Sequence, residues 1–211
     1  MLDQTTRDVK TPPVLKLVPV SAGHARRLAG LAGDEESPPW ATAPQRSPLE
    51  NVLAFIARAQ RLRAREACDT FAVFDADRLV GLAVLARDPS VPDQAELGYW
   101  IAEPDRGRGH ATAAARRLLS HAFGRLNLAV VFARCPSANR ASARVLERLR
   151  FAASEPSPGL TSGADPVRRY ELTHHEWLGR AGACPPPASP SPISRRGTSP
   201  RPTSATPRPP P

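Results

Sequence analysis

The apolar residues of the chain follow two kinds of spacing, which together predict alternating strands and helices. Short apolar or alternating runs predict strands, whereas apolar residues three and four positions apart predict amphipathic helices. The predicted order is β-α-α-β-β-β-α-β-α-β-β. Strands are expected at 14–18, 71–74, 79–85, 94–101, 129–133, 151–154 and 168–173, and helices at 21–31, 49–68, 111–126 and from 139 onwards.

A loop with two glycines joins the strand at 94–101 to the long helix at 111–126. The segment 106–112 reads Arg-Gly-Arg-Gly-His-Ala-Thr. A strand that runs through glycines into a helix points several unpaired backbone N–H groups at one place, where the positive end of the helix dipole also lies. Glycine lets an anion approach the backbone closely, and the two arginines raise the local positive potential. The segment therefore predicts a pyrophosphate site.

Two common phosphate-binding loops do not fit this segment. A P-loop needs Gly-Lys-Ser/Thr at the start of the helix, and the segment 106–112 has no lysine. A dinucleotide-binding loop needs a third glycine at the position where this chain has Thr112. The pyrophosphate ligand is therefore expected to belong to another class of cofactor.

The loop resembles the acyl-CoA loop of the GNAT superfamily of N-acyltransferases. The family consensus Gln/Arg-x-x-Gly-x-Gly/Ala is matched by Arg106-x-x-Gly109-x-Ala111. The similarity continues in 96–101 and in 139–151, where Asn-x-x-Ser begins a helix, as in the branch of the ribosomal-protein N-terminal alanine acetyltransferases. The resemblance implies an α/β fold of the α+β type, with a mixed, mostly antiparallel sheet flanked by helices.

The resemblance also implies how acetyl-CoA, as co-substrate, would be bound. Backbone amides of the loop would hold the pyrophosphate, the strand backbone before the loop would pair with the pantetheine, and Asn139 would contact the cofactor as well as cap its helix. For His110 only the backbone N–H is expected to matter. The predicted cofactor-binding residues are Trp100, Ile101, Arg106, Gly107, Arg108, Gly109, His110, Ala111, Thr112 and Asn139.

Two residues are predicted to take part in the chemistry. Glu96 would accept the proton of the acceptor amine, directly or through water, because only a neutral amine attacks and a protein α-amino group has a pKa of about 8. The structural alternative for Glu96 is a surface position or an ion pair. Ser142 would stabilise the departing thiolate by a hydrogen bond. The two tyrosines, Tyr99 and Tyr170, are not counterparts of the tyrosine that acts as an acid in other branches.

Composition separates a domain at 13–178 from two terminal segments. From residue 179 onwards the chain is rich in Pro, Ser, Thr and Arg, and it contains eleven of the 25 prolines and no acidic residue. Such a segment buries too little apolar surface to offset its ordering entropy, so we expect 179–211 to be disordered and 1–12 to be flexible. Five charges of the formal net +9 belong to this tail. They permit weak contact with RNA or ribosomes but do not indicate a specific nucleic-acid site.

Several other classes of protein are not indicated by the sequence. Cys68, Cys135 and Cys184 have neither metal-ligand nor disulfide spacing, so no metal is expected. No apolar run approaches the ~18 residues of a membrane span, and the first residues lack a signal-peptide pattern. We therefore expect a soluble, cytoplasmic protein that is a monomer or a homodimer.

The predicted function is acetyl transfer from acetyl-CoA to a primary amine by direct attack, on either a protein N-terminal α-amine or a small-molecule amine. The alternative is a catalytically silent acyl-CoA-binding regulatory module. The segment 34–48, which includes Trp40, contains no motif that identifies the acceptor. One position departs from the family: Arg150 replaces the glycine of Leu-Gly-Phe. It should cost roughly 1 kcal/mol or alter the turn.

Overall fold

The structure, a computed structural model, describes residues 13–31, 47–154, 161–162 and 165–179. The predicted flexible N-terminus, the tail beyond residue 179 and Trp40 lie outside these residues. The elements are β1 (Leu15–Pro19), η1 (Ala22–His24), α1 (Ala25–Ala29), α2 (Pro48–Ala64), β2 (Cys68–Asp75), β3 (Arg78–Asp88), β4 (Val91–Ile101), η2 (Glu103–Asp105), α3 (His110–Gly124), β5 (Val130–Pro136), α4 (Arg140–Arg148), β6 (Ala152–Ala153), β7 (Thr161–Ser162), β8 (Asp165–Thr173) and α5 (His174–Leu178).

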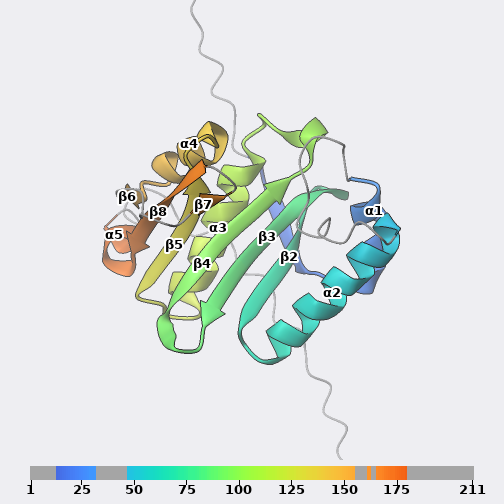
Figure 1. Ribbon diagram of the computed structural model, residues 1–211, viewed down its shortest axis with the longest axis horizontal. Coiled ribbons are helices and arrows are strands. Elements are labelled where there is room, and N and C mark those ends of the chain that lie inside the picture. The colour runs from blue at the N-terminus through green and yellow to red at the C-terminus, as the bar shows by residue number, and fades with distance from the viewer. Residues whose placement is uncertain (1–12, 32–46, 155–160, 163–164, 180–211) are drawn as a thin grey trace, which may run out of the picture.

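A single twisted sheet forms the centre of the fold (Figure 1). Its strands lie in the order β1-β2-β3-β4-β5-β8-β6, and β7 pairs with β8 alone. Every neighbouring pair is antiparallel except β4–β5, which is parallel. The predicted fold class, a mixed and mostly antiparallel sheet with helices, is therefore confirmed.

Helices pack on both faces of the sheet (Figure 1). Helices α1 and α2 share one core cluster with β2 and β3, through residues such as Leu28, Ile56 and Leu82. Helices α3 and α4 share the other cluster, through residues such as Leu118 and Leu146. None of the helices in the described part of the chain combines the length and apolar character that crossing a lipid bilayer requires.

Helix α2 is shorter than its sequence pattern predicts. It ends at Ala64 rather than at residue 68, and Cys68 is already the first residue of β2. The cause is a left-handed turn at Glu66, which has φ 56°. The amide of Ala67 donates to the carbonyl of Leu62, which closes the helix end. The sequence has no glycine at this turn that would indicate it.

Helix α4 ends in the same kind of turn at Arg150, which has φ 62°. The Arg150 amide donates to the carbonyl of Glu147 at 2.8 Å, and the Phe151 amide donates to that of Leu146 at 3.0 Å. This is the Schellman arrangement, and the buried side chains of Leu146 and Phe151 supply its apolar contact. The turn therefore has the geometry that a glycine would adopt, and Arg150 takes up the strained left-handed backbone conformation.

Helix α3 is tied to β2 near its C-terminal end. The ring of His121 lies 3.5 Å from the buried carboxylate of Asp69, which Arg63 and Arg87 also approach at 3.7 Å. Burial alone would raise the pKa of Asp69, but the nearby His121 ring and the charges of the two arginines outweigh it and lower this pKa. The contact fixes the helix at the end opposite the glycine loop.

Replacing Arg150 with glycine should raise the free energy of unfolding by about 1 kcal/mol, because glycine has no Cβ to strain at positive φ. The greater freedom of glycine in the unfolded chain reduces this gain. Urea denaturation measures the change. As a matched control, Arg144→Gly at an exposed position in the middle of α4 should lower the free energy of unfolding by about 1 kcal/mol. A destabilised Arg150→Gly variant would mean that side-chain contacts outweigh backbone strain at this turn.

Candidate functional site

Strands β4 and β5 separate after Glu96. Their parallel pairing covers only three pairs, from Gln94–Val130 to Glu96–Phe132. Beyond this point β4 stays paired with β3 as far as Ile101, and β5 stays paired with β8 as far as Pro136. The facing edges of the two strands therefore have no strand partner in the described structure. Because backbone polar groups need hydrogen-bond partners, an extended chain with amide groups fits this opening.

The glycine loop supplies free backbone donors next to this opening. Gly107 has φ 72° and Gly109 has φ 85°, both in the left-handed region. Gly109 precedes α3, and no side chain caps this helix. The first bond within α3 joins the Ala113 amide to the Gly109 carbonyl, so the amides of 110–112 have no acceptor inside the helix. These amides and the helix dipole form the arrangement that the sequence predicts for a pyrophosphate.

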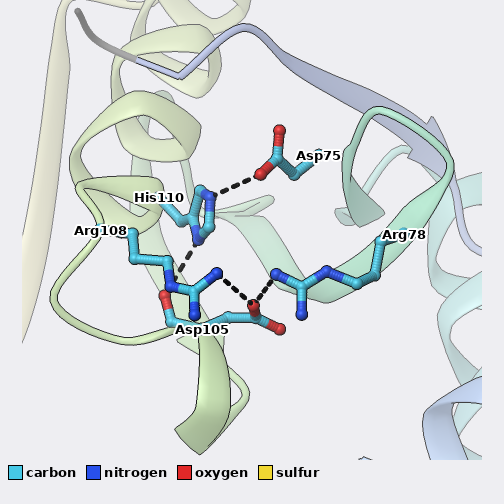
Figure 2. Close-up of polar contacts among 5 residues, drawn as sticks. All are labelled: Asp75, Arg78, Asp105, Arg108 and His110. Atoms are coloured by element: carbon cyan, nitrogen blue, oxygen red, sulfur yellow. Dashed lines mark hydrogen bonds and ion pairs between the residues drawn. The ribbon is translucent and has the colours of Figure 1, made fainter. Parts of the chain in front are cut away.

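Buried polar groups connect the glycine loop to the turn between β2 and β3 (Figure 2). The carboxylate of Asp105, only 3% exposed, pairs with Arg78 and lies 4.0 Å from the Arg108 guanidinium. The buried ring of His110 has Nδ1 3.0 Å from the Asp105 carbonyl and Nε2 3.1 Å from the Asp75 carboxylate. Both ring nitrogens of His110 are thus engaged in the scaffold, while its backbone amide has no acceptor inside α3.

The main chain at the end of β4 is partly used by the loop itself. Arg106 donates from Nε to the carbonyl of Ile101 at 3.1 Å, which closes the loop onto the strand. The side chain of Ile101 is buried, and that of Trp100 packs against the α1–α2 core cluster. The side chains of Trp100 and Ile101 therefore serve the core, and only their backbone lies along the opening.

Glu96 lies at the start of the opening, on the face of the sheet opposite Leu97 and Tyr99, because successive strand residues alternate. Its carboxylate lies 2.9 Å from the guanidinium of Arg134 on β5. The Glu96 side chain is 33% exposed and that of Arg134 is 47% exposed. The ion pair named as the structural alternative is therefore present, while the carboxylate remains accessible at the opening.

Ser142 lies on the other face, in the first turn of α4. Its amide donates to Oδ1 of the N-cap residue Asn139 at 2.9 Å. Its hydroxyl lies 2.8 Å from the hydroxyl of Tyr99, which reaches across from β4. The Cys135 thiol at the end of β5 is buried nearby, and burial raises its pKa, although a hydrogen bond with Ser142 partly offsets this.

The structure brings the predicted site residues together around one opening. The glycine loop and the first turns of α3 and α4 lie beside it, with Glu96 and Ser142 on opposite faces of the sheet. Sequence reasoning missed two partners, Arg134 and Tyr99. Because side chains alternate along a strand, Tyr99 is predicted to lie on the same face of the sheet as Leu97. No local pattern predicts that Arg134 or Tyr99 contacts a site residue.

Comparison with known protein families identifies the family to which the chain belongs. The family described as acetyltransferase (GNAT) domain matches residues 15–152. The chain belongs to this family. It is 40% identical over 73 residues to the putative ribosomal N-acetyltransferase YdaF of Bacillus subtilis, an alignment that covers 35% of this chain and 40% of that protein. The chain spans about half or less of the length of the curated relatives that it matches.

Solved structures share the fold. A ribosomal L7/L12 α-N-protein acetyltransferase, RimL, in complex with coenzyme A, is similar with a TM-score of 0.66 and 20% identity, over 75% of this chain and 93% of that one. A dodecameric spermidine N-acetyltransferase from Vibrio cholerae is similar with a TM-score of 0.63 and 22% identity, over 79% of this chain and 98% of that one. At these identities the similarity establishes the fold alone.

Replacing Gly107 with alanine should weaken the binding of coenzyme A at least tenfold. Nothing lies within 4 Å of the position of the new Cβ, so the substitution costs only backbone strain of about 1–2 kcal/mol at φ 72°. The same Cβ would stand where a diphosphate approaches the amides. Calorimetry with coenzyme A measures the affinity.

Gly124→Ala is the matched control for this variant. Gly124 ends α3, has open space around its Cβ position, and lies outside the left-handed region. Its replacement should leave the affinity for coenzyme A unchanged. Equal affinities for the Gly107→Ala variant and the unaltered chain would show that the loop does not hold the diphosphate.

Proposed function

We propose that the chain transfers an acetyl group from acetyl-CoA to a primary amine by direct attack, and that its preferred acceptor is the α-amino group of a protein N-terminus. The observation that carries the proposal is the opening between β4 and β5, bordered by the glycine loop, Glu96 and Ser142. Membership of the GNAT family supports the donor and the reaction. The similarity to YdaF supports a ribosomal-protein acceptor.

The residues present fit the coenzyme. The amides of 110–112 and the left-handed glycines suit its diphosphate, and the unpaired strand edge suits the amides of its pantetheine arm. When bound, the coenzyme supplies the thioester whose acetyl group is transferred. Amide groups on the β4 edge would polarise the thioester carbonyl.

The acceptor arrives as an ammonium group and first loses one proton to solvent, because only the neutral amine attacks. Glu96 would take the second proton of the amine as the new N–C bond forms. As the C–S bond breaks, its electron pair goes to sulfur, and the hydroxyl of Ser142 would stabilise the resulting thiolate by a hydrogen bond. Glu96 then returns its proton to solvent, from which the thiolate takes one. Because the two groups lie on opposite faces of the sheet, the amine would approach the tetrahedral centre from the face of Glu96, and the departing sulfur would lie towards the face of Ser142.

The ion pair between Glu96 and Arg134 is compatible with this role. Both side chains are substantially exposed, and such pairs contribute only ~0–1 kcal/mol. An incoming ammonium group can therefore displace Arg134 at small cost. The displacement leaves the guanidinium of Arg134 uncompensated next to the bound amine.

The uncompensated positive charge of Arg134 favours an acceptor with a single positive charge. A second guanidinium, that of Arg169, lies 3.7 Å from the centre of the Phe132 ring on the same face, and Arg134 lies 5.7 Å from that ring. Arg169 is compensated by Glu171. A polyamine would bring further ammonium groups next to Arg134, whereas a protein N-terminus brings one.

An acceptor panel tests this preference. With acetyl-CoA as donor, peptides with a free N-terminus should release coenzyme A with a kcat/KM at least tenfold higher than that of spermidine. The same peptides with an acetylated N-terminus should be inactive. A higher kcat/KM for spermidine would assign the chain to small-molecule acetylation instead.

Replacing Glu96 with glutamine should lower kcat at least tenfold, since the amide cannot accept the proton. The affinity for coenzyme A should not change. Steady-state kinetics with the best acceptor and calorimetry with coenzyme A measure the two quantities. Glu147→Gln, which alters an exposed glutamate on α4, is the control and should keep full activity.

Two outcomes would contradict the proposal in different ways. Full turnover of the Glu96→Gln variant would reduce Glu96 to a structural partner of Arg134. Binding of coenzyme A without turnover of any amine by the unaltered chain would instead support a silent acyl-CoA-binding module.

A further inference from the structure

Tyr99 connects β4 to α4 beside the opening between β4 and β5. It follows the last β4–β5 pair by three residues, and its side chain points to the face of α3 and α4, with Leu97. Its hydroxyl lies 2.8 Å from the hydroxyl of Ser142 and 3.3 Å from the Ser142 carbonyl oxygen. Tyr99 is thus the contact through which β4 touches the residue expected to face the leaving sulfur.

The role of Ser142 depends on which of the two hydroxyls, that of Ser142 or that of Tyr99, donates the hydrogen bond between them. A serine hydroxyl donates one proton, and so does a tyrosine hydroxyl. If Ser142 donates to Tyr99, its proton is not available to a thiolate. If Tyr99 donates to Ser142 Oγ, the shorter of its two contacts at 2.8 Å against 3.3 Å to the Ser142 carbonyl, the serine proton does not point to Tyr99 and can point into the opening.

The surroundings of Ser142 restrict where its proton can go. In a helix, a serine hydroxyl commonly donates to a carbonyl one turn earlier. The carbonyl of Asn139, in that turn, already accepts from the Ala143 amide at 3.1 Å and from the Cys135 thiol at 3.5 Å. The Asn139 side chain accepts from the Ser142 amide. The remaining neighbour is the Cys135 thiol, which takes part in a hydrogen bond with Ser142. Because sulfur is a weak acceptor, it competes weakly for the serine proton.

The acidity of Tyr99 decides which role it can play. Burial raises the pKa of Tyr99 to about 12, against a smaller opposing effect of its hydrogen bond to Ser142. A thiol has a pKa of about 8.5, so Tyr99 does not give its proton to a thiolate. It keeps the proton and acts as a hydrogen-bond donor throughout.

We infer that Tyr99 is a positioning residue for the leaving group: by donating to Ser142 Oγ, it orients the serine hydroxyl towards the departing sulfur. The inference rests on the role of Ser142 in the proposed function. Donation from Tyr99 also polarises the serine hydroxyl and strengthens it as a donor. No proton moves between Tyr99 and Ser142, so the number of protons exchanged during acetyl transfer stays the same.

A double-mutant cycle tests the inference. Tyr99→Phe removes only the hydroxyl and should lower kcat about fivefold, the range expected for one hydrogen bond. KM for the acceptor and the affinity for coenzyme A should stay within twofold. In a Ser142→Ala background, Tyr99→Phe should cause no further loss, because Tyr99 acts through that hydroxyl. Tyr170→Phe, at the other tyrosine, should leave kcat unchanged.

The outcomes separate this inference from the proposed function. If Ser142→Ala lowers kcat and Tyr99→Phe does not, the role of Tyr99 is wrong and the proposed function stands. Additive losses in the double variant would show that Tyr99 acts through packing rather than through Ser142. Full activity of Ser142→Ala would overturn both the leaving-group role and the inference. Thermal unfolding of each variant checks that the fold is intact.

Discussion

The site depends on the separation of β4 and β5 in the middle of a continuous sheet. Backbone N–H and C=O groups inside a sheet are normally satisfied by both neighbours, and leaving them unpaired is costly. Here each strand keeps its partner on the outer side, β3 for β4 and β8 for β5, so the sheet holds together while the two inner edges stay available. The opening is therefore a built feature of the topology rather than a frayed end.

Strand alternation turns this opening into a site with two sides. Glu96 and Tyr99 are three residues apart on one strand, so their side chains point to opposite faces. On the face of Glu96 the sheet carries charged, partly exposed side chains. On the face of Tyr99 it meets the first turn of α4 and Ser142. The two faces of the sheet thus present different groups at the same opening, a carboxylate on one and a hydroxyl on the other.

The polar contacts around the site differ in burial and therefore in the free energy needed to break them. Asp105 and His110 are almost fully buried, and their partners tie the glycine loop to the β2–β3 turn. Breaking such contacts would leave buried polar groups unsatisfied, so they keep the loop in place. The Glu96–Arg134 pair is half exposed, and a ligand can exchange with it at little cost. The contacts that hold the glycine loop are thus buried, whereas the Glu96–Arg134 pair can rearrange.

The sequence by itself determined the order of strands and helices, the glycine loop and the motif residues, because hydrophobic spacing and glycine requirements are local properties of the chain. It failed at the end of α2, where Glu66 takes a left-handed conformation that no glycine announces. Only the tertiary structure decided where β4 leaves β5, and that Tyr99 meets Ser142 across a separation of 43 residues. It alone paired Glu96 with Arg134. Such contacts depend on how distant segments pack, and no periodicity within a single segment encodes them.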